Sequence, residues 1–213
     1  MAKVTSSKIV QAYIDQLLEV GRRPSSVYQF AKSIKIKEEE FYDHFSSFDA
    51  IEAGWMSTLF ESVTEELAAD EVFQAYSARE KYMAFLYAWV EKCRGNRSFL
   101  LLLSEKSMMP NPLPAGFSSI KKHFRDFADS IVREGFDTQE VKQRPLLSDR
   151  YADAMFLQFA FVHSFWLKDS SKGFEKTDMA IEKSVHLAFD LMGQSAFDSA
   201  LEFGKFLFQQ KRA

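Results

Sequence analysis

Apolar residues recur at the spacing of an α-helix along nearly the whole chain, and this periodicity restricts the possible folds more than any other feature. The members of one apolar face return every three or four positions, and Gly or Pro interrupts the pattern at intervals that suit single helices. No stretch shows the regular alternation typical of a half-buried strand. With 46% hydrophobic residues, among them 22 Phe, the 213-residue chain has ample side-chain volume for a helical core. The sequence therefore predicts an all-α protein.

The N-terminal part is expected to contain short helices with recognisable ends. Ser6 or Ser7 is suited to cap the first helix, because a hydroxyl oxygen can accept a free backbone N–H there. Gly21 is placed to end that helix. Ser25 or Ser26 is suited to cap a short second helix.

A third short helix, expected within residues 35–45, follows a tight turn and precedes a long fourth helix. Ser46 or Ser47 is suited to cap the fourth helix. Its apolar stripe is Ile51, Trp55, Leu59, Val63 and Leu67. Short helices around a tight turn predict a helix-turn-helix module. We expect this module over residues 1–48 and a larger ligand-binding and dimerisation domain over residues 49–213.

The remainder of the chain is expected to form a helical body. Three of its apolar stripes are Tyr82, Leu86, Trp89 and Cys93; Phe117, Ile120, Phe124, Phe127 and Ile131; and Ile181, Val185, Ala188 and Met192. A further apolar piece over 98–109 leads into a proline-containing loop at 110–114, and Gly135 is placed to end the helix that follows. Residues 149–168 are apolar on nearly every side, and a last amphipathic segment spans 197–208.

At its N-terminal module the chain resembles the TetR family of transcriptional regulators. The residues that carry the resemblance are Gly21, Ser25-Ser26-Val27, Phe30-Ala31, Ile36, Phe41-Tyr42-x-His44-Phe45 and Phe45-x-Ser47. The resemblance implies a TetR-like fold, a homodimer, DNA as a partner and a hydrophobic small-molecule or lipid ligand, with no cofactor. It also implies that the DNA contacts come from Ser25, Ser26, Lys35, Lys37, Tyr42 and His44.

The third helix departs from the family pattern in ways that oppose DNA binding. Lys35 stands where the family commonly has Gly, and Lys37 stands where it has a capping Ser or Thr. The helix then opens with three glutamates, residues 38–40, whose carboxylates would approach the phosphates of a major groove. Phe48 replaces a lysine that commonly contacts phosphate, and basic and acidic residues balance over residues 1–49. We therefore expect weak, strongly salt-dependent DNA binding.

Large aromatic residues of the body are candidates for a ligand cavity. Together with one histidine, the set is Phe85, Trp89, Phe127, Phe156, Phe159, His163 and Trp166. They can line a roomy lipophilic pocket or form a dense core, and the sequence leaves both interpretations open. His163 correspondingly either bonds within the core or orients a ligand, and a metal or catalytic role is the third alternative.

Two helices of the body are candidates for a four-helix interface between two copies of the chain. The residues expected in this dimer interface are Phe161, Phe165, Ile181, Val185, Ala188 and Met192.

Composition and motifs argue against other classes of protein. The net charge of −3 and the pI of about 5.9 provide no general attraction to nucleic acid or an anionic membrane. Cys93 lies in an apolar pattern, and the four histidines lack metal-site spacing, so we expect no metal. The sequence contains neither a phosphate-binding loop nor a nucleophile motif, so we do not expect an enzyme. No apolar stretch reaches the roughly 20 residues of a membrane span, and we expect a cytoplasmic protein.

Two functions fit these observations. The first is a dimeric regulator that binds DNA through its helix-turn-helix and responds to a hydrophobic effector. The alternative is a protein with the same fold that no longer binds DNA and instead binds a lipid, an isoprenoid or a protein partner.

Overall fold

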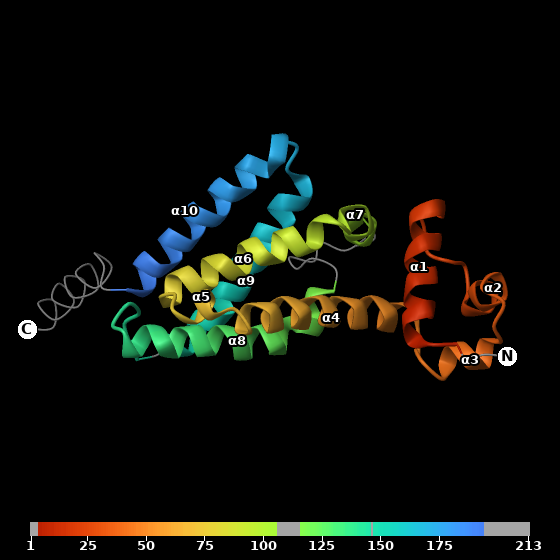
Figure 1. The fold of residues 1–213 in the computed structure, drawn as a ribbon, viewed down its shortest axis with the longest axis horizontal. Helices are drawn as coiled ribbons and strands as arrows, with labels where there is room; N and C mark the ends of the chain where they lie inside the picture. The colour runs from red at the N-terminus through yellow and green to blue at the C-terminus, as the bar shows by residue number, and fades with distance from the viewer. Residues whose placement is uncertain (1–3, 106–115, 146, 194–213) are drawn as a thin grey trace, which may run out of the picture. The chain divides into compact units, whose positions relative to one another are not determined.

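The computed structural model describes residues 4–105, 116–145 and 147–193 of the chain (Figure 1). Every regular element in these ranges is a helix, which confirms the all-α fold class. The expected loop at 110–114 and the expected last helix at 197–208 lie outside the described residues.

Close contacts group the chain into two compact units, each assembled from segments that are distant in the sequence. The first unit comprises residues 1–65 and 89–121, and the second comprises residues 66–88 and 122–213. The boundary expected after residue 48 does not coincide with this grouping. The reason is that the start of the fourth helix and a later short helix complete the core of the three N-terminal helices.

The first unit encloses the helix-turn-helix. Its helices are α1 (Ser6–Val20), α2 (Val27–Ser33), α3 (Glu38–Tyr42), the start of α4 (Phe48–Ala68), the end of α6 (Ala78–Arg94), α7 (Arg97–Glu105) and the start of α8 (Phe117–Asp137). Their shared core includes Ile9, Tyr13 and Leu17 of α1, Phe30 of α2, Phe41 of α3, Ile51 of α4, and Phe99 and Leu103 of α7. The short helices α2 and α3 bury too little surface to be stable alone, so this shared core holds them in place.

The N-terminal helix ends follow from local hydrogen bonding. Thr5, rather than either of the two serines after it, caps α1, and its hydroxyl accepts the N–H of Lys8 at 3.4 Å. The left-handed φ of 71° at Gly21 ends α1, as expected. Ser47 caps α4, because its Oγ accepts the N–H of Ala50 at 3.1 Å.

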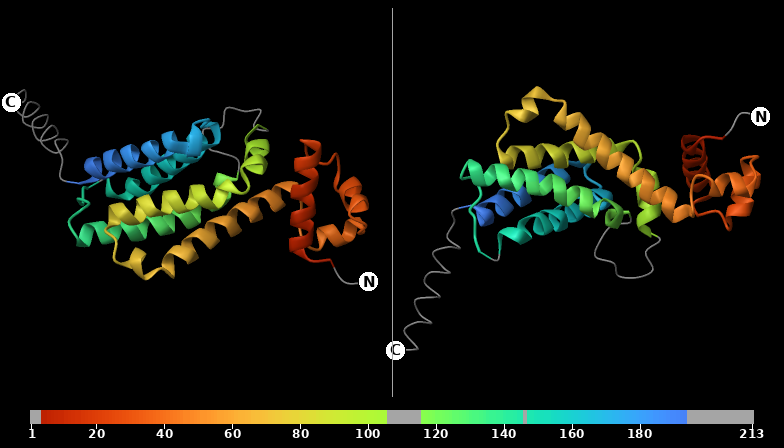
Figure 2. Two further views of the ribbon diagram at one scale, coloured as in Figure 1. Left: turned by 45° about the horizontal axis from the view of Figure 1, so that its top comes forward. Right: turned by 90° about the horizontal axis from the view of Figure 1, so that it is seen from below.

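The second unit carries the C-terminal helical pair. Its elements are α5 (Glu71–Gln74), the remaining parts of α4, α6 and α8, the 3-10 turns η1 (Ser148–Arg150) and η2 (Lys172–Phe174), α9 (Tyr151–Lys168) and α10 (Glu175–Met192). Helices α9 and α10 lie side by side (Figures 1 and 2). The one-turn helix α5 was not expected from the sequence. It begins behind Asp70, whose carboxylate accepts the N–H of Val72 at 2.8 Å.

A buried carboxylate fixes the turn between α9 and α10. Asp169 accepts hydrogen bonds from the N–H and hydroxyl of Ser171 at 2.8 and 2.7 Å. It also accepts bonds from the N–H and hydroxyl of Thr177 at 2.9 and 2.7 Å. Burial opposes ionisation of Asp169, but these four donors stabilise the carboxylate and lower its pKa to about 2. Asp169 therefore joins the turn, through Ser171, to the first turn of α10, through Thr177.

Gly135 does not end α8, contrary to the expectation. The helix continues to Asp137, and the left-handed Gln139 then turns the chain back. The N–H of Val141 donates to the carbonyl of Gly135 at 2.9 Å. A Cβ at position 135 would lie only 2.5 Å from Cγ2 of Val141, so the glycine serves close packing of the returning chain.

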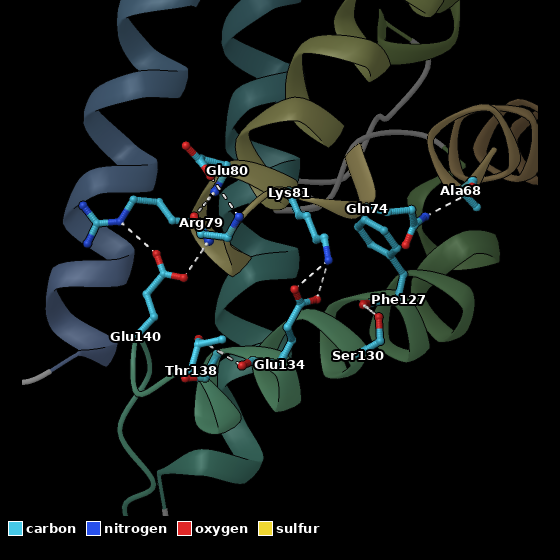
Figure 3. A network of polar contacts seen from close by, with 12 residues as sticks. Ala68, Gln74, Arg79, Glu80, Lys81, Phe127, Ser130, Glu134, Thr138 and Glu140 are labelled. Carbon is cyan, nitrogen blue, oxygen red and sulfur yellow. Dashed lines mark hydrogen bonds and ion pairs between the residues drawn. The ribbon is translucent and has the colours of Figure 1, made fainter. Parts of the chain in front are cut away.

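Ion pairs connect α6 with its neighbours in the second unit (Figure 3). The Nζ of Lys81 lies 2.6 and 2.7 Å from the two carboxylate oxygens of Glu134 on α8. Arg79 pairs with Glu140 in the following loop, at 3.7 Å, and with Asp190 of α10, at 2.9 Å. These contacts set the positions of α8 and α10 against the start of α6.

Candidate nucleic-acid and ligand sites

The turn between α2 and α3 is built by backbone hydrogen bonds that require a left-handed residue. Helix α2 begins behind Ser26, whose Oγ accepts a backbone N–H at 3.2 Å. At its end, the N–H of Ile36 bonds the carbonyl of Ala31 at 3.0 Å, and that of Lys35 bonds Lys32 at 3.3 Å. This pair of bonds is a Schellman motif, and Lys35 has the positive φ of 60° that the motif needs. A lysine therefore occupies a position suited to glycine.

Helix α3 neutralises its own basic residue. The Nζ of Lys37 lies 3.1 Å from Oε1 of Glu39, and both side chains are largely exposed. The hydrogen bond and the charge of Glu39 raise the pKa of Lys37. Glu40 accepts the backbone N–H of Lys37 at 2.8 Å and so helps to start the helix. The face that would enter a groove therefore presents carboxylates with little uncompensated positive charge.

Most of the residues expected to contact DNA are exposed around the turn. This is the case for Ser25, Ser26, Lys35, Lys37 and Tyr42, of which Tyr42 is 52% exposed. His44 has a different environment, because its side chain is half-buried. Its Nδ1 lies 3.0 Å from Oγ of Ser6, and its Nε2 lies 3.1 Å from the carbonyl of Val4. His44 therefore fastens the end of α3 to the start of α1, and both ring nitrogens are engaged inside the module.

A polar cluster at the start of α4 was not anticipated from the sequence. The carboxylate of Glu52 binds both the hydroxyl of Tyr13 and the guanidinium of Arg23. One signal was available, because Glu52 interrupts the otherwise apolar buried face of α4. Its partners are 39 and 29 residues away in the chain, and no local pattern identifies them.

Several of the expected ligand-binding aromatics form one ring cluster in the second unit. The ring of Phe85 lies 4.8 Å from that of Phe127 and 5.2 Å from that of Phe159. Phe124, which was expected only as part of a stripe, stacks on Phe159 at 5.0 Å and lies 5.4 Å from Phe156. These rings occupy the space between α6, α8 and α9, so a ligand that enters here has to displace side chains.

The other three candidates lie outside that cluster of rings. His163 and Trp166 are buried farther along α9, with ring centroids 5.9 Å apart. Burial lowers the pKa of His163 to about 3, so the imidazole is neutral in the folded protein. Trp89 belongs to the first unit, where it lies 6.1 Å from Phe117 and 6.4 Å from Phe60.

The expected dimer-interface residues divide between the surface and the core. Phe161 is 50% exposed, and Phe165 and Ala188 are partly buried. Ile181, Val185 and Met192, in contrast, are buried in the chain's own core and their side chains are not available to a partner. The apolar side chains that α9 and α10 leave exposed are Leu157, Phe161, Met179, Leu187 and Leu191.

Three further observations concern metal ligands, Cys93 and membrane-spanning helices. The described residues contain no cluster of three or more His, Cys, Asp or Glu residues that could hold a metal. Cys93 is buried, and burial raises the pKa of its thiol. None of the described helices is both long and apolar enough to cross a membrane.

Comparison with known families decides the class of this helical protein. A sequence model described as the tetracyclin repressor-like C-terminal domain matches residues 81–207, which is more than half of the chain. The chain belongs to the TetR family. The match covers helices of both units, whereas the initial resemblance concerned only the N-terminal module. A comparison with curated protein sequences gives no match.

Solved structures of TetR regulators share the fold at low sequence identity. FadR of Thermus thermophilus, solved with lauroyl-CoA, is 15% identical with a TM-score of 0.64, and the alignment covers 87% of this chain and 94% of FadR. FadR of Bacillus subtilis, solved with stearoyl-CoA, is 16% identical with a TM-score of 0.61 and coverage of 84% and 96%. A TetR regulator from Nitrosomonas europaea is 12% identical with a TM-score of 0.60 and coverage of 86% and 96%. At these identities the likeness concerns the fold.

Proposed function

We propose that this TetR-family chain is a homodimeric transcriptional regulator that binds DNA weakly through α2 and α3 and responds to a hydrophobic ligand. The observation that carries the proposal is the exposed helix-turn-helix of a TetR-family protein. Ser25, Lys35 and Tyr42 are on its surface, where they can reach a phosphate backbone. The glutamates of α3 lower the affinity, because they add negative charge where phosphates would lie.

The second copy is proposed to cover the exposed apolar side chains of α9 and α10. Leu187 is 61% exposed and Phe161 is 50% exposed, and each lies on one of two neighbouring helices. Two such pairs can associate as a four-helix interface with twofold symmetry. Light scattering at micromolar concentration should give the mass of a dimer. Leu187→Glu should shift it toward the monomer, whereas Leu18→Glu, an exposed leucine of α1, should not. A monomeric wild type would contradict this interface.

The proposed ligand carries an acyl chain. Two structural neighbours were solved with acyl-CoA esters, and the ring cluster around Phe85, Phe127 and Phe159 offers an apolar environment for a chain. Lauroyl-CoA and stearoyl-CoA should raise the melting temperature, while free coenzyme A should not. If no fatty acid, acyl ester or isoprenoid raises the melting temperature of the protein, this part of the proposal is contradicted.

A mobility-shift assay with the DNA upstream of the protein's own gene tests the DNA-binding role. The double variant Glu38→Gln, Glu39→Gln removes four negative charges per dimer and frees Lys37, while it keeps the contribution of Glu40 to helix initiation. We expect affinity at low salt to rise by about tenfold or more, because each solvated charge near phosphate is worth roughly 1 kcal/mol or less. The matched control is Glu61→Gln, Glu65→Gln, which removes two exposed glutamates of α4.

The alternative function is a TetR-fold protein that binds a lipid or a protein partner without binding DNA. The observation that favours it is the pairing of Lys37 with Glu39 on an otherwise acidic α3. If neither the wild type nor the double glutamine variant shifts DNA at low salt, and both are dimers, the regulator proposal fails. Stabilisation by an acyl ligand in the same preparations would then support the alternative.

A further inference from the structure

Glu52 is a buried carboxylate at the start of the second turn of α4, and it contacts two other segments of the helix-turn-helix. The residue is 8% exposed. Its Oε1 accepts the hydroxyl of Tyr13, a fully buried residue of α1, at 2.5 Å. The same oxygen accepts Nε of Arg23 at 3.0 Å, and Nη2 of Arg23 bonds the other oxygen.

Arg23 extends this network along α4. It lies in the turn between α1 and α2, two residues after the left-handed Gly21. Its Nη2 also bonds Oδ1 of Asp49 at 2.5 Å, so one guanidinium spans the first turns of α4. Three segments of the first unit, namely α1, the turn after it and α4, therefore meet at one carboxylate.

The two donors of the network, Arg23 and Tyr13, both hold their protons in the folded protein. Hydrogen bonding to Glu52 raises the pKa of Arg23 above its ordinary value. Burial and then the bond to Glu52 raise the pKa of Tyr13, so its hydroxyl stays protonated and donates. A carboxylate with two charge-assisted partners in a buried place is costly to leave unpaired.

Aromatic packing next to the network makes its geometry specific. The ring of Tyr13 stacks on that of Phe48, the first residue of α4, at 5.1 Å and 16°. Phe48 in turn lies 5.6 Å from Phe30 of α2 and 5.8 Å from Phe41 of α3. The first turn of α4 is thus part of the helix-turn-helix core, and Glu52 adds a directional attachment one turn later.

We propose that Glu52 is a positioning residue that fixes α1, α2 and α3 on α4 as one rigid body through Arg23 and Tyr13. A hydrophobic surface alone permits small rotations of α4 against α1, whereas bonds to two oxygens of one carboxylate restrict them. Its consequence for DNA rests on the proposed function: Glu52 touches no DNA, but it sets the orientation in which α3 is presented. Movement of α4 would then carry the whole module without a hinge at residues 46–52.

Hydrogen exchange of the full-length protein tests this attachment without DNA. In Glu52→Gln, amides of α1 and α2 should exchange at least about tenfold faster relative to amides of α9, because the side chain loses its charge and one of its two acceptor oxygens and places an NH2 donor beside Tyr13 or Arg23. Tyr13→Phe, which deletes one hydroxyl, should accelerate the same amides by a smaller factor. The control Val63→Ala removes buried methyl groups of α4 away from the network and should not change the ratio. If the exchange rates of the α1 and α2 amides relative to the α9 amides are the same in Glu52→Gln and Val63→Ala, the proposal is overturned.

Measuring the DNA affinity of the same variants distinguishes a failure of the role of Glu52 from a failure of the proposed function. If the wild type binds DNA, Glu52→Gln should weaken binding at least about tenfold while the dimer persists, and Val63→Ala should bind like the wild type. If the wild type does not bind at any salt concentration, the proposed function fails, and the exchange ratios still decide the role of Glu52. If Glu52→Gln raises the exchange rate of the α1 and α2 amides relative to α9 but leaves DNA affinity unchanged, Glu52 attaches the helices to α4 without setting how α3 is presented to DNA.

Discussion

Burial of His163 should make the stability of this protein depend on pH between about 7 and 3. The imidazole lies on α9 and is 1% exposed, and burial lowers its pKa from 6.5 to about 3. In the unfolded chain the same group takes up a proton near its ordinary value. The unfolded state therefore binds more protons than the folded state below that value. The stabilising contribution is complete above pH 6.5 and decreases as the pH falls toward 3.

The magnitude follows from the two pKa values. Each pH unit between the unfolded value and the folded value of about 3 costs about 1.4 kcal/mol. From pH 7 to pH 5 the loss attributable to His163 is about 2 kcal/mol, since the group titrates in the unfolded chain over most of this interval. Asp169 does not contribute here, because its pKa of about 2 places its own loss of stability below about pH 4.

Urea denaturation at pH 7, 6 and 5, at fixed protein concentration and ionic strength, measures this dependence. In His163→Met, which has no titratable group, the loss between pH 7 and 5 should be smaller than in the wild type by about 2 kcal/mol. His123→Gln, which replaces an exposed histidine of α8, should keep the wild-type slope. Parallel stability curves for the wild type and His163→Met would refute the reasoning, because they would mean that His163 is not protonated preferentially in the unfolded chain.

Four further substitutions should change the free energy of unfolding, measured by denaturation at pH 7. Lys35→Gly should stabilise the protein by about 0.5–1 kcal/mol, because it relieves a left-handed lysine at the cost of a more flexible unfolded chain; a loss would contradict this. Gly135→Ala should destabilise by about 1–3 kcal/mol through contact with Val141, whereas Gly54→Ala, with open space around its Cβ, should stabilise by up to about 1 kcal/mol. Arg144→Met should cost about 3 kcal/mol, because this buried guanidinium bonds three carbonyls at the end of α10; an unchanged unfolding midpoint would argue against that role.

Features set by a few neighbouring residues could be predicted from the sequence. The end of α1 at Gly21, the start of α2 behind Ser26 and the start of α4 behind Ser47 each depend on one residue and a backbone N–H or carbonyl within four positions. The sequence also shows that Lys35 stands where the family commonly has glycine, and in the structure this residue has a positive φ. Local hydrogen-bonding geometry is enough to fix these positions.

Features that depend on residues distant in the chain could not be predicted in this way. Gly135 resembles a helix end, but its role depends on the returning Val141. His44 was expected to face phosphate, and its ring instead bonds Ser6 and Val4, about 40 residues earlier. In both cases a residue distant in the chain determines what the side chain or glycine does.

The two faces of α10 illustrate why an interface is hard to assign from periodicity. The strongest apolar stripe, which includes Ile181 and Val185, is buried inside the chain, since a helix that packs in its own subunit uses its most apolar face for that core. Leu187 and Leu191 form a second, smaller apolar face that remains exposed. A periodicity argument ranks faces by hydrophobicity and therefore selects the core face first. The face proposed to contact the second copy is the less apolar face of α10. It can be identified only because the structure shows that the more apolar face is buried within the chain.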